Sequence, residues 1–221
     1  MQAWGTSSKF ETRATDYYPS KSAVIGIIAA SLGYKRDDDE KVQKLNNLDF
    51  AVRIDQEGIL QKDYHIASKY KENGDFERNY VTNRYYMGDA VFVVAISSQD
   101  EKWIDEIIKA IESPYFQPFM GRRSCPLPLD FIIGSTEKGA IEALEQLEWQ
   151  AADWYKKKNQ NYRADIYADK SLQKDRPFII RNDRVISFSQ KERKFGPRFE
   201  VRLSKQMATR EEKPLDFYGS I

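Results

Sequence analysis

The spacing of apolar residues divides the first 135 positions into short helices and strands. Residues 22–32 are apolar on nearly every side between Ser22, a residue type that caps helices, and Gly33, a residue type that ends them. An all-round apolar helix of this kind is typical of one that is buried against a sheet. Residues 101–111 instead carry a single apolar stripe, which predicts an amphipathic helix on the surface of the core.

Strand patterns lie between and after these helices. Apolar and polar residues alternate at 48–55, and a continuous apolar run marks 90–96 as a buried strand. The remaining elements of this part are a short amphipathic helix at 38–48, a partner strand at 59–66 and a strand at 127–133. Helices and strands in this order predict an α+β fold, with a ferredoxin-like layer in which helices cover one face of a sheet.

Residues 67–86 break this pattern because aliphatic side chains are scarce there. Basic and aromatic residues interleave around the turn sequence Asn73-Gly74-Asp75, so the segment predicts a hairpin that protrudes from the core. An arm of this composition offers stacking surfaces and phosphate contacts to a single-stranded nucleic acid. The alternative is a surface loop whose tyrosines cover a nearby core.

The second part of the chain, residues 136–221, predicts a helix followed by a smaller β-rich region. The helix is expected at 138–158, and Asn182-Asp183 is expected to form a hairpin turn. The strands are expected at 177–180, 185–188 and 199–203. Two regions therefore follow from the pattern, 1–135 and 136–221.

Composition restricts the class of protein more than it restricts function. The 221 residues are 41% apolar, enough for a core, and their net charge of +1 argues neither for nor against nucleic acid. Cys125 is the single cysteine, which excludes an internal disulfide and a cysteine-based zinc site and fits a reducing cytoplasm. Residues 23–32 form the longest apolar stretch, about half of a membrane span. We expect a soluble cytoplasmic protein without a cofactor, a metal or a membrane partner.

Charge is distributed unevenly along the chain. Residues 181–210 hold nine basic and three acidic side chains, whereas residues 137–153 hold five acidic side chains and one lysine. This asymmetry predicts one face toward a polyanion and another toward solvent or a partner. The alternative is a chance run of solvated strands.

The strongest candidate for binding chemistry is the sequence Gly121-Arg122-Arg123-Ser124-Cys125-Pro126. A glycine that exposes backbone N–H groups beside two guanidiniums forms an anion site, and the planar fork of arginine matches phosphate. The alternative is a solvated turn with two surface arginines. Lys21-Ser22 resembles the end of a phosphate-binding loop, but the glycines required upstream are absent, which argues against nucleotide hydrolysis. A phosphate contact at this helix start stays open.

His65 is the only histidine, and any enzyme hypothesis rests on it. With Tyr64 and Lys62 nearby it offers a general base for metal-independent RNA cleavage. Successive strand residues point to opposite faces, so Tyr64 and His65 do not aim at one phosphate without a bulge. A structural or RNA-contacting histidine is therefore favoured, and a metal-independent endoribonuclease is the alternative.

Several short motifs, taken in chain order, are together similar to one known family. They are Met1-Gln2-Ala3-Trp4-Gly5, Phe10-Glu11-Thr12-Arg13, Tyr18-Pro19-Ser20-Lys21-Ser22-Ala23-Val24-Ile25-Gly26, Leu32-Gly33-Tyr34-Lys35-Arg36-Asp37-Asp38, Phe50-Ala51-Val52-Arg53-Ile54-Asp55, Asp63-Tyr64-His65 and the arginine turn. On these motifs the chain resembles, over residues 1–129, the CasD-type subunits of the type I-E CRISPR surveillance complex, Cascade, which belong to the RAMP superfamily.

The resemblance implies a non-catalytic subunit that holds the 5′ handle of the crRNA and contacts the backbone subunit and the large subunit of Cascade. A separate subunit performs the cleavage in that system, and the alternative function for this chain is a metal-independent endoribonuclease that processes precursor crRNA. The hairpin at 67–86 corresponds to a thumb that reaches over the guide, and Arg84 lies at its base. The RNA contacts implied are Trp4, Arg13, Lys21, Ser22, Arg84, Gly121, Arg122, Arg123 and Ser124.

The resemblance also bears on the beginning of the chain. Family members carry a short apolar strand before the Met1-Gln2-Ala3-Trp4-Gly5 motif, which this sequence does not contain. We therefore expect a sheet that lacks its first strand and presents an unpaired edge.

Overall fold

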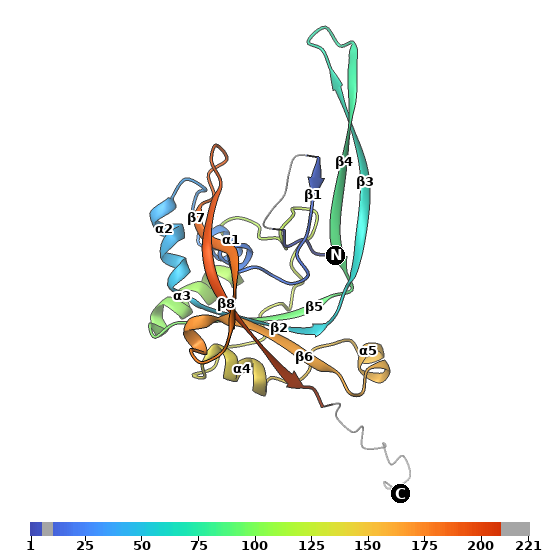
Figure 1. The fold of residues 1–221 in the computed structure, drawn as a ribbon. Coiled ribbons are helices and arrows are strands. Elements are labelled where there is room, and N and C mark those ends of the chain that lie inside the picture. The colour runs from blue at the N-terminus through green and yellow to red at the C-terminus, as the bar shows by residue number, and fades with distance from the viewer. Residues whose placement is uncertain (6–10, 209–221) are drawn as a thin grey trace, which may run out of the picture.

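A computed structural model describes residues 1–5 and 11–208, which form two sheets, helices on two sides and a long projecting hairpin (Figure 1). The helices are α1 (Lys21–Ser31), α2 (Asp39–Lys44), α3 (Glu101–Glu112), α4 (Ala140–Gln146) and α5 (Asp153–Lys158), with 3-10 turns η1 (Leu45–Asn47) and η2 (Lys170–Leu172). The strands are β1 (Thr12–Arg13), β2 (Asp49–Gln56), β3 (Ile59–Tyr70), β4 (Phe76–Gly88), β5 (Val91–Ser97), β6 (Arg163–Asp169), β7 (Phe178–Ser187) and β8 (Lys194–Gln206). The predicted α+β class is confirmed.

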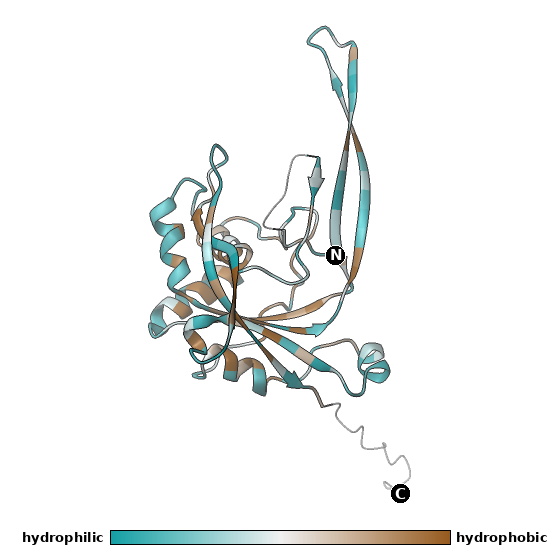
Figure 2. Cartoon of the chain, viewed as in Figure 1, coloured by the Kyte–Doolittle hydropathy of each residue, from teal (hydrophilic) through white to brown (hydrophobic). Residues whose placement is uncertain are grey.

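The main sheet has five antiparallel strands in the order β5-β2-β6-β8-β7. Helix α4 packs on one face through Ala140, Ile141 and Leu144, which meet fully buried residues of β2, β6 and β8. Figure 2 shows hydrophobic segments in α4 and in the strands above it. Because β2 pairs with β6, the sheet is continuous across residue 135, and the predicted division there does not separate two sheets.

A second core joins α1, α2 and α3 to the β7 edge of the main sheet. Ile25 and Ile28 of α1 pack with Ile107 of α3 and Val185 of β7, and each of the four is at most 2% exposed. Helix α1 begins two residues earlier than predicted, because Ser20 and not Ser22 caps it by accepting a hydrogen bond from the backbone N–H of Ala23. Among the described residues, no helix is long and apolar enough to cross a membrane.

The hairpin of β3 and β4 is longer than the predicted arm at 67–86 and starts at Ile59. Figure 1 shows it standing away from the main sheet, with β1 lying parallel to β4 at its lower half. The prediction that 59–66 pairs with 48–55 is wrong, since β5 and β6 occupy both edges of β2 and leave β3 only β4 as a partner. The prediction of a protruding hairpin itself is correct.

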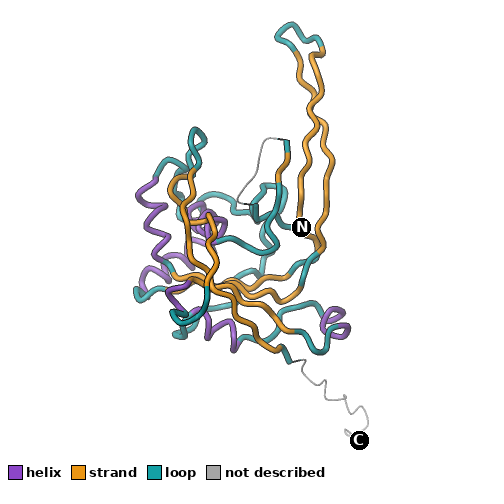
Figure 3. Tube along the Cα trace, in the orientation of Figure 1, coloured by secondary structure: helices purple, strands orange, loops and turns teal. Residues whose placement is uncertain are grey.

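Three other sequence predictions differ from the structure. Residues 127–133 form no strand, and Figure 3 shows the segment between α3 and α4 as loop. Pro126 and Pro128 lack the N–H groups that a sheet ladder needs. The helix predicted at 138–158 is divided into α4 and α5. The carbonyls of Leu144, Leu147 and Glu148, at and beyond the end of α4, accept hydrogen bonds from the guanidinium of Arg53 in β2.

The predicted turn at Asn182-Asp183 is instead the middle of the continuous strand β7. Asp183 is fully buried and accepts two hydrogen bonds from Arg198 on the neighbouring strand β8. Aspartate is common in turns, but Asp183 is stable inside this strand because Arg198 on the neighbouring strand neutralises its charge.

Candidate nucleic-acid interface

Four separated segments meet beside the lower half of the hairpin. The backbones of Gln2 and Met87 exchange two hydrogen bonds of 2.9 and 2.8 Å, which attach the beginning of the chain to the end of β4. The N–H of Ala3 donates to the carbonyl of Met120 at 3.2 Å, which attaches it to the arginine turn as well. Strand β1 is the fourth segment and pairs with β4 at Asn83 and Arg84.

The arginine turn packs so tightly on the beginning of the chain that only glycine fits at position 121. Gly121 has φ +77°, and a Cβ added there would lie 1.6 Å from the carbonyl oxygen of Ala3. Below the turn, Ala3, Tyr86 and Cys125 form a small buried core. The backbone of residues 121–125 therefore has one fixed position relative to β4.

This packing brings three of the predicted arginines together. The guanidinium of Arg122 lies 4.4 Å from the ring centroid of Tyr86, and its Nη2 donates to the carbonyl oxygen of Arg13 at 2.7 Å. Arg13 is the register partner of Arg84 across the β1–β4 ladder. Arg123 and Ser124 are exposed on the same turn. We call Arg13, Arg84, Arg122 and Arg123 the arginine cluster.

Three polar atoms in and beside this cluster are shielded from solvent yet have no hydrogen-bond partner among residues 1–5 and 11–208. They are Oδ1 of Asn83, Nε of Arg84 and Nη1 of Arg122. Folded proteins satisfy nearly all such atoms, and one left unsatisfied costs about 1–3 kcal/mol. The guanidinium N–H groups of Arg84 and Arg122 are suited to a bound phosphate. Asn83 is the register partner of Tyr64 and therefore lies on the opposite face of the hairpin from Arg84.

The electrostatics of the arginine cluster also favour an anion. Asp63 lies opposite Arg84 in the β3–β4 register, but no ion pair joins a carboxylate to any arginine of the cluster within the described residues. Four arginines of the main sheet, Arg53, Arg181, Arg198 and Arg202, each have an acidic partner. The cluster therefore differs from these four in its uncompensated positive charge.

Trp4 does not present its ring to a ligand. It is 5% exposed, its Nε1 donates to the side-chain oxygen of Gln2 at 2.9 Å, and its backbone N–H donates to the hydroxyl of Thr15 at 2.9 Å. The prediction of an RNA contact by this ring is not supported, since the residue anchors the beginning of the chain behind the cluster.

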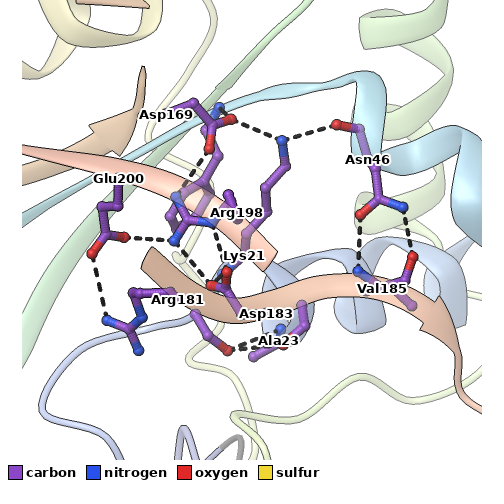
Figure 4. A network of polar contacts seen from close by, with 12 residues as sticks. Lys21, Ala23, Asn46, Asp169, Arg181, Asp183, Val185, Arg198 and Glu200 are labelled. Carbon is purple, nitrogen blue, oxygen red and sulfur yellow. Dashed lines mark hydrogen bonds and ion pairs between the residues drawn. The ribbon is translucent and has the colours of Figure 1, made fainter. Parts of the chain in front are cut away.

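Lys21 belongs to a buried polar network rather than to the surface (Figure 4), and Ser22 is buried next to it in the chain. Nζ of Lys21 contacts the carboxylate of Asp169 at 2.8 Å and the carbonyl of Asn46 at 2.9 Å, and the residue is 6% exposed. Ser22 is 5% exposed and its hydroxyl contacts that of Ser20. The predicted phosphate contacts at these residues are therefore not supported, because burial and internal partners keep both side chains away from a nucleic acid.

The centre of this network is Arg198, whose guanidinium contacts Asp169 at 2.9 Å, Asp183 at 2.7 Å and Glu200 at 2.5 Å. Burial opposes its charge, but the hydrogen bonds and charges of these carboxylates outweigh burial and raise the pKa of Arg198 above its ordinary value. Arg181 pairs with Asp16 and Glu200. Part of the basic excess at 181–210 is therefore consumed inside the protein and does not form a polyanion-binding face.

His65 lies on an exposed, regular part of the hairpin. The β3–β4 register shifts only at Lys69/Tyr70, so Tyr64 and His65 point to opposite faces, as the sequence predicts. In the part of the chain that the structure describes, no three His, Cys, Asp or Glu side chains gather in a group that could hold a metal.

One residue of the site was missed from the sequence, Tyr86. The available signal was strand alternation, which places Thr82, Arg84 and Tyr86 on one face of β4. Tyr86 then supplies the aromatic surface under Arg122, a contact between distant segments that no local pattern indicates.

The comparison with known proteins identifies the family. The sequence profile described as CRISPR-associated protein (Cas_Cas5) matches residues 1–200. The chain belongs to the Cas5 family of CRISPR-associated proteins. The "CRISPR system Cascade subunit CasD" of Escherichia coli (strain K12) is 35% identical over 152 residues, which cover 62% of this chain and 67% of that protein. The family resemblance seen in the sequence is thus confirmed.

Solved structures agree with this membership of the Cas5 family. A chain of a "CRISPR RNA-guided surveillance complex" matches with a TM-score of 0.76 and 26% identity, over 93% of this chain and 86% of that one. A second match, "Crystal structure of Cas protein", has a TM-score of 0.63 and 25% identity, over 92% and 89% of the two chains.

Proposed function

We propose that this Cas5 protein is a non-catalytic subunit of a type I-E Cascade complex that binds the 5′ handle of the crRNA through the arginine cluster. The observation that carries the proposal is the pair of shielded, unpartnered guanidinium N–H groups on Arg84 and Arg122. Guanidiniums bind phosphates bidentately and stack on bases. Single-stranded RNA exposes both its phosphates and its bases to such contacts. The proposed setting is the cytoplasm, where the crRNA is made.

The two faces of the hairpin suit two different partners. Arg84 and Tyr86 both lie on the face that meets the arginine turn. The opposite face carries the exposed apolar residues Leu60, Tyr64, Ile66 and Val81. We assign the arginine face to the crRNA and the apolar face to the adjacent backbone subunit, with the large subunit of Cascade as a further partner.

Replacing Arg122 and Arg123 together by Ala is expected to weaken binding of handle RNA and to flatten its salt dependence. For single-stranded RNA the logarithmic salt slope falls by about 0.7 for each phosphate that the protein no longer neutralises. Fluorescence anisotropy with a labelled handle RNA across a salt titration measures both effects.

The double Lys variant at Arg122 and Arg123 is the matched comparison, because it keeps the charge and lacks the bidentate fork. It should recover only part of the affinity. Unchanged affinity and slope in the double Ala variant would remove this turn from the RNA site.

The endoribonuclease alternative is separated by incubating the purified protein with repeat RNA in EDTA. We expect the RNA to be bound and to stay full length, in the wild type and in His65→Ala alike. A cut that appears in EDTA and disappears in His65→Ala would establish the enzyme instead, since only a metal-independent nuclease acts under these conditions.

Shortening the hairpin is expected to weaken assembly without unfolding the protein. Replacing residues 69–78 by an Asn-Gly turn keeps the Ser68↔Asn79 pair and its 2.8 Å side-chain hydrogen bond, and removes residues that are all exposed. Native mass spectrometry of the complex reconstituted with backbone subunit and crRNA measures incorporation. Full incorporation of the shortened protein would show that the outer hairpin contacts no partner.

A further inference from the structure

A second concentration of positive charge lies at α5 and the turn that follows it, apart from the arginine cluster. Figure 1 shows α5 below the base of the hairpin, next to the start of β6, whereas β1 runs beside the hairpin above. Lys157, Lys158 and Arg163 are exposed, and none of them forms an ion pair within the described residues.

These three cations line one open pocket of about 580 Å³. The amide side chains of Gln160 and Asn161 line it as well, and Glu57 contributes its one carboxylate. Cations with amide donors are the lining that suits phosphates and the hydroxyl and base edges of a nucleotide. The pocket does not suit an apolar ligand, since Tyr162 is the only aromatic residue that lines it.

A tryptophan adjoins the same cations. Trp154 is 57% exposed, an unusual state for the largest apolar side chain. It precedes Lys157 and Lys158 by three and four positions in α5, so the three side chains share one face of the helix. A role of the lysines in stabilising the end of the helix explains neither this exposure nor Arg163, which lies outside the helix.

The surface is held in a fixed position. The ring of Trp149 stacks on Tyr162 at 5.2 Å between centroids, and Tyr155 packs edge-on against both. The hydroxyl of Tyr162 donates to the carbonyl of Ile54 in β2 at 3.0 Å, and the N–H of Ala152 donates to Gln56. A prearranged surface of this kind loses little conformational entropy when it binds.

We propose that Trp154, Lys157, Lys158 and Arg163 form a second nucleic-acid-binding surface for a single-stranded segment. A base stacks on Trp154, and the three cations contact the phosphates on either side of it, without selecting a sequence. Single strands are favoured over duplexes because a stacking platform requires an unpaired base. The proposal does not depend on the handle-binding role of the arginine cluster.

The test uses the full chain and a labelled twelve-nucleotide oligothymidylate, which carries no handle sequence. Substitution of Lys157, Lys158 and Arg163 by Ala should weaken binding and lower the logarithmic salt slope by about 2, that is about 0.7 for each of three phosphates. Trp154→Ala should weaken binding about tenfold through the absence of stacking. Glu57→Gln should strengthen binding, since it removes the one carboxylate of the pocket.

Two controls keep the result specific. A triple Ala variant at Lys102, Lys109 and Lys138 changes the net charge equally and should bind like the wild type. Oligothymidylate should quench the tryptophan fluorescence of the wild type and of Arg122→Ala/Arg123→Ala, but not of Trp154→Phe. Of the other three tryptophans, Trp4 and Trp149 are buried, and Trp103 packs against the core that α1, α2 and α3 form, away from this surface. An equal loss in the control triple, persistent quenching in Trp154→Phe, or tighter binding of a twelve-base-pair duplex would overturn the proposal.

Discussion

Gly121→Ala is expected to displace the arginine turn and to abolish tight binding of handle RNA. The new Cβ would lie 1.6 Å from the carbonyl oxygen of Ala3 and 2.8 Å from its carbon, distances at which backbone atoms must move. The φ of +77° adds about 1 kcal/mol of strain for any residue with a side chain. Because Arg122 reaches Arg13 and Tyr86 only from this turn, the cluster separates.

Gly74→Ala is the matched control at the tip of the hairpin. Gly74 has a φ of +88°, so the substitution introduces a similar strain, but no atom lies within 4 Å of the added Cβ. We expect this variant to bind handle RNA like the wild type in the same anisotropy assay. Wild-type affinity of Gly121→Ala would show that the turn does not have to rest on Ala3 for binding.

Arg198→Ala is expected to destabilise the protein by about 3–5 kcal/mol, because it leaves Asp169, Asp183 and Glu200 buried around an absent cation. The ammonium of Lys21 contacts only Asp169 of these three, and Asp183 receives no more than the backbone N–H of Lys21, so the charge of Lys21 does not compensate for the loss. The network joins the start of α1 to β6, β7 and β8, which makes the effect global. Chemical denaturation measures it as a lowered free energy of unfolding.

Arg202→Ala is the matched control, because it removes the same charge from an exposed position four residues further along β8. Arg202 pairs with Asp165 on the surface, where its side chain is 65% exposed, and such pairs contribute about 0–1 kcal/mol. The two variants remove the same charge from β8. Equal unfolding free energies would show that the buried network adds nothing to stability beyond a surface ion pair.

The elements that sequence predicts well are those whose local signals agree. Helix α3 has both a cap, Asp100, and a clear apolar stripe, and its predicted and observed bounds differ by one residue. The turn sequence Asn73-Gly74-Asp75 and the scarcity of aliphatic residues around it predict the hairpin. A glycine beside two arginines predicts the arginine turn. These features depend on neighbours in the chain, so a sequence displays them.

The features that sequence misses depend on distant partners. Strand β6 (Arg163–Asp169) reads as polar, yet Ala164, Ile166 and Ala168 are fully buried between β2 and β8. Lys21 at a helix start has the appearance of a phosphate ligand, and only the fold reveals Asp169 beside it. Asp183 has the appearance of a turn residue until Arg198 is placed across the ladder. In the cases of Lys21 and Asp183, a charge that the sequence places on the surface is buried and paired in the fold.

Photocrosslinking tests the central claim most directly, the claim that crRNA lies across the arginine cluster. Handle RNA carrying 4-thiouridine would be irradiated with the full chain at limiting protein, and the crosslinked peptides would be located by mass spectrometry. The structure predicts crosslinks within residues 80–88 and 119–125, which surround Arg84 and Arg122, and their loss in Arg84→Ala/Arg122→Ala. Strong crosslinking that bypasses both segments would contradict the account.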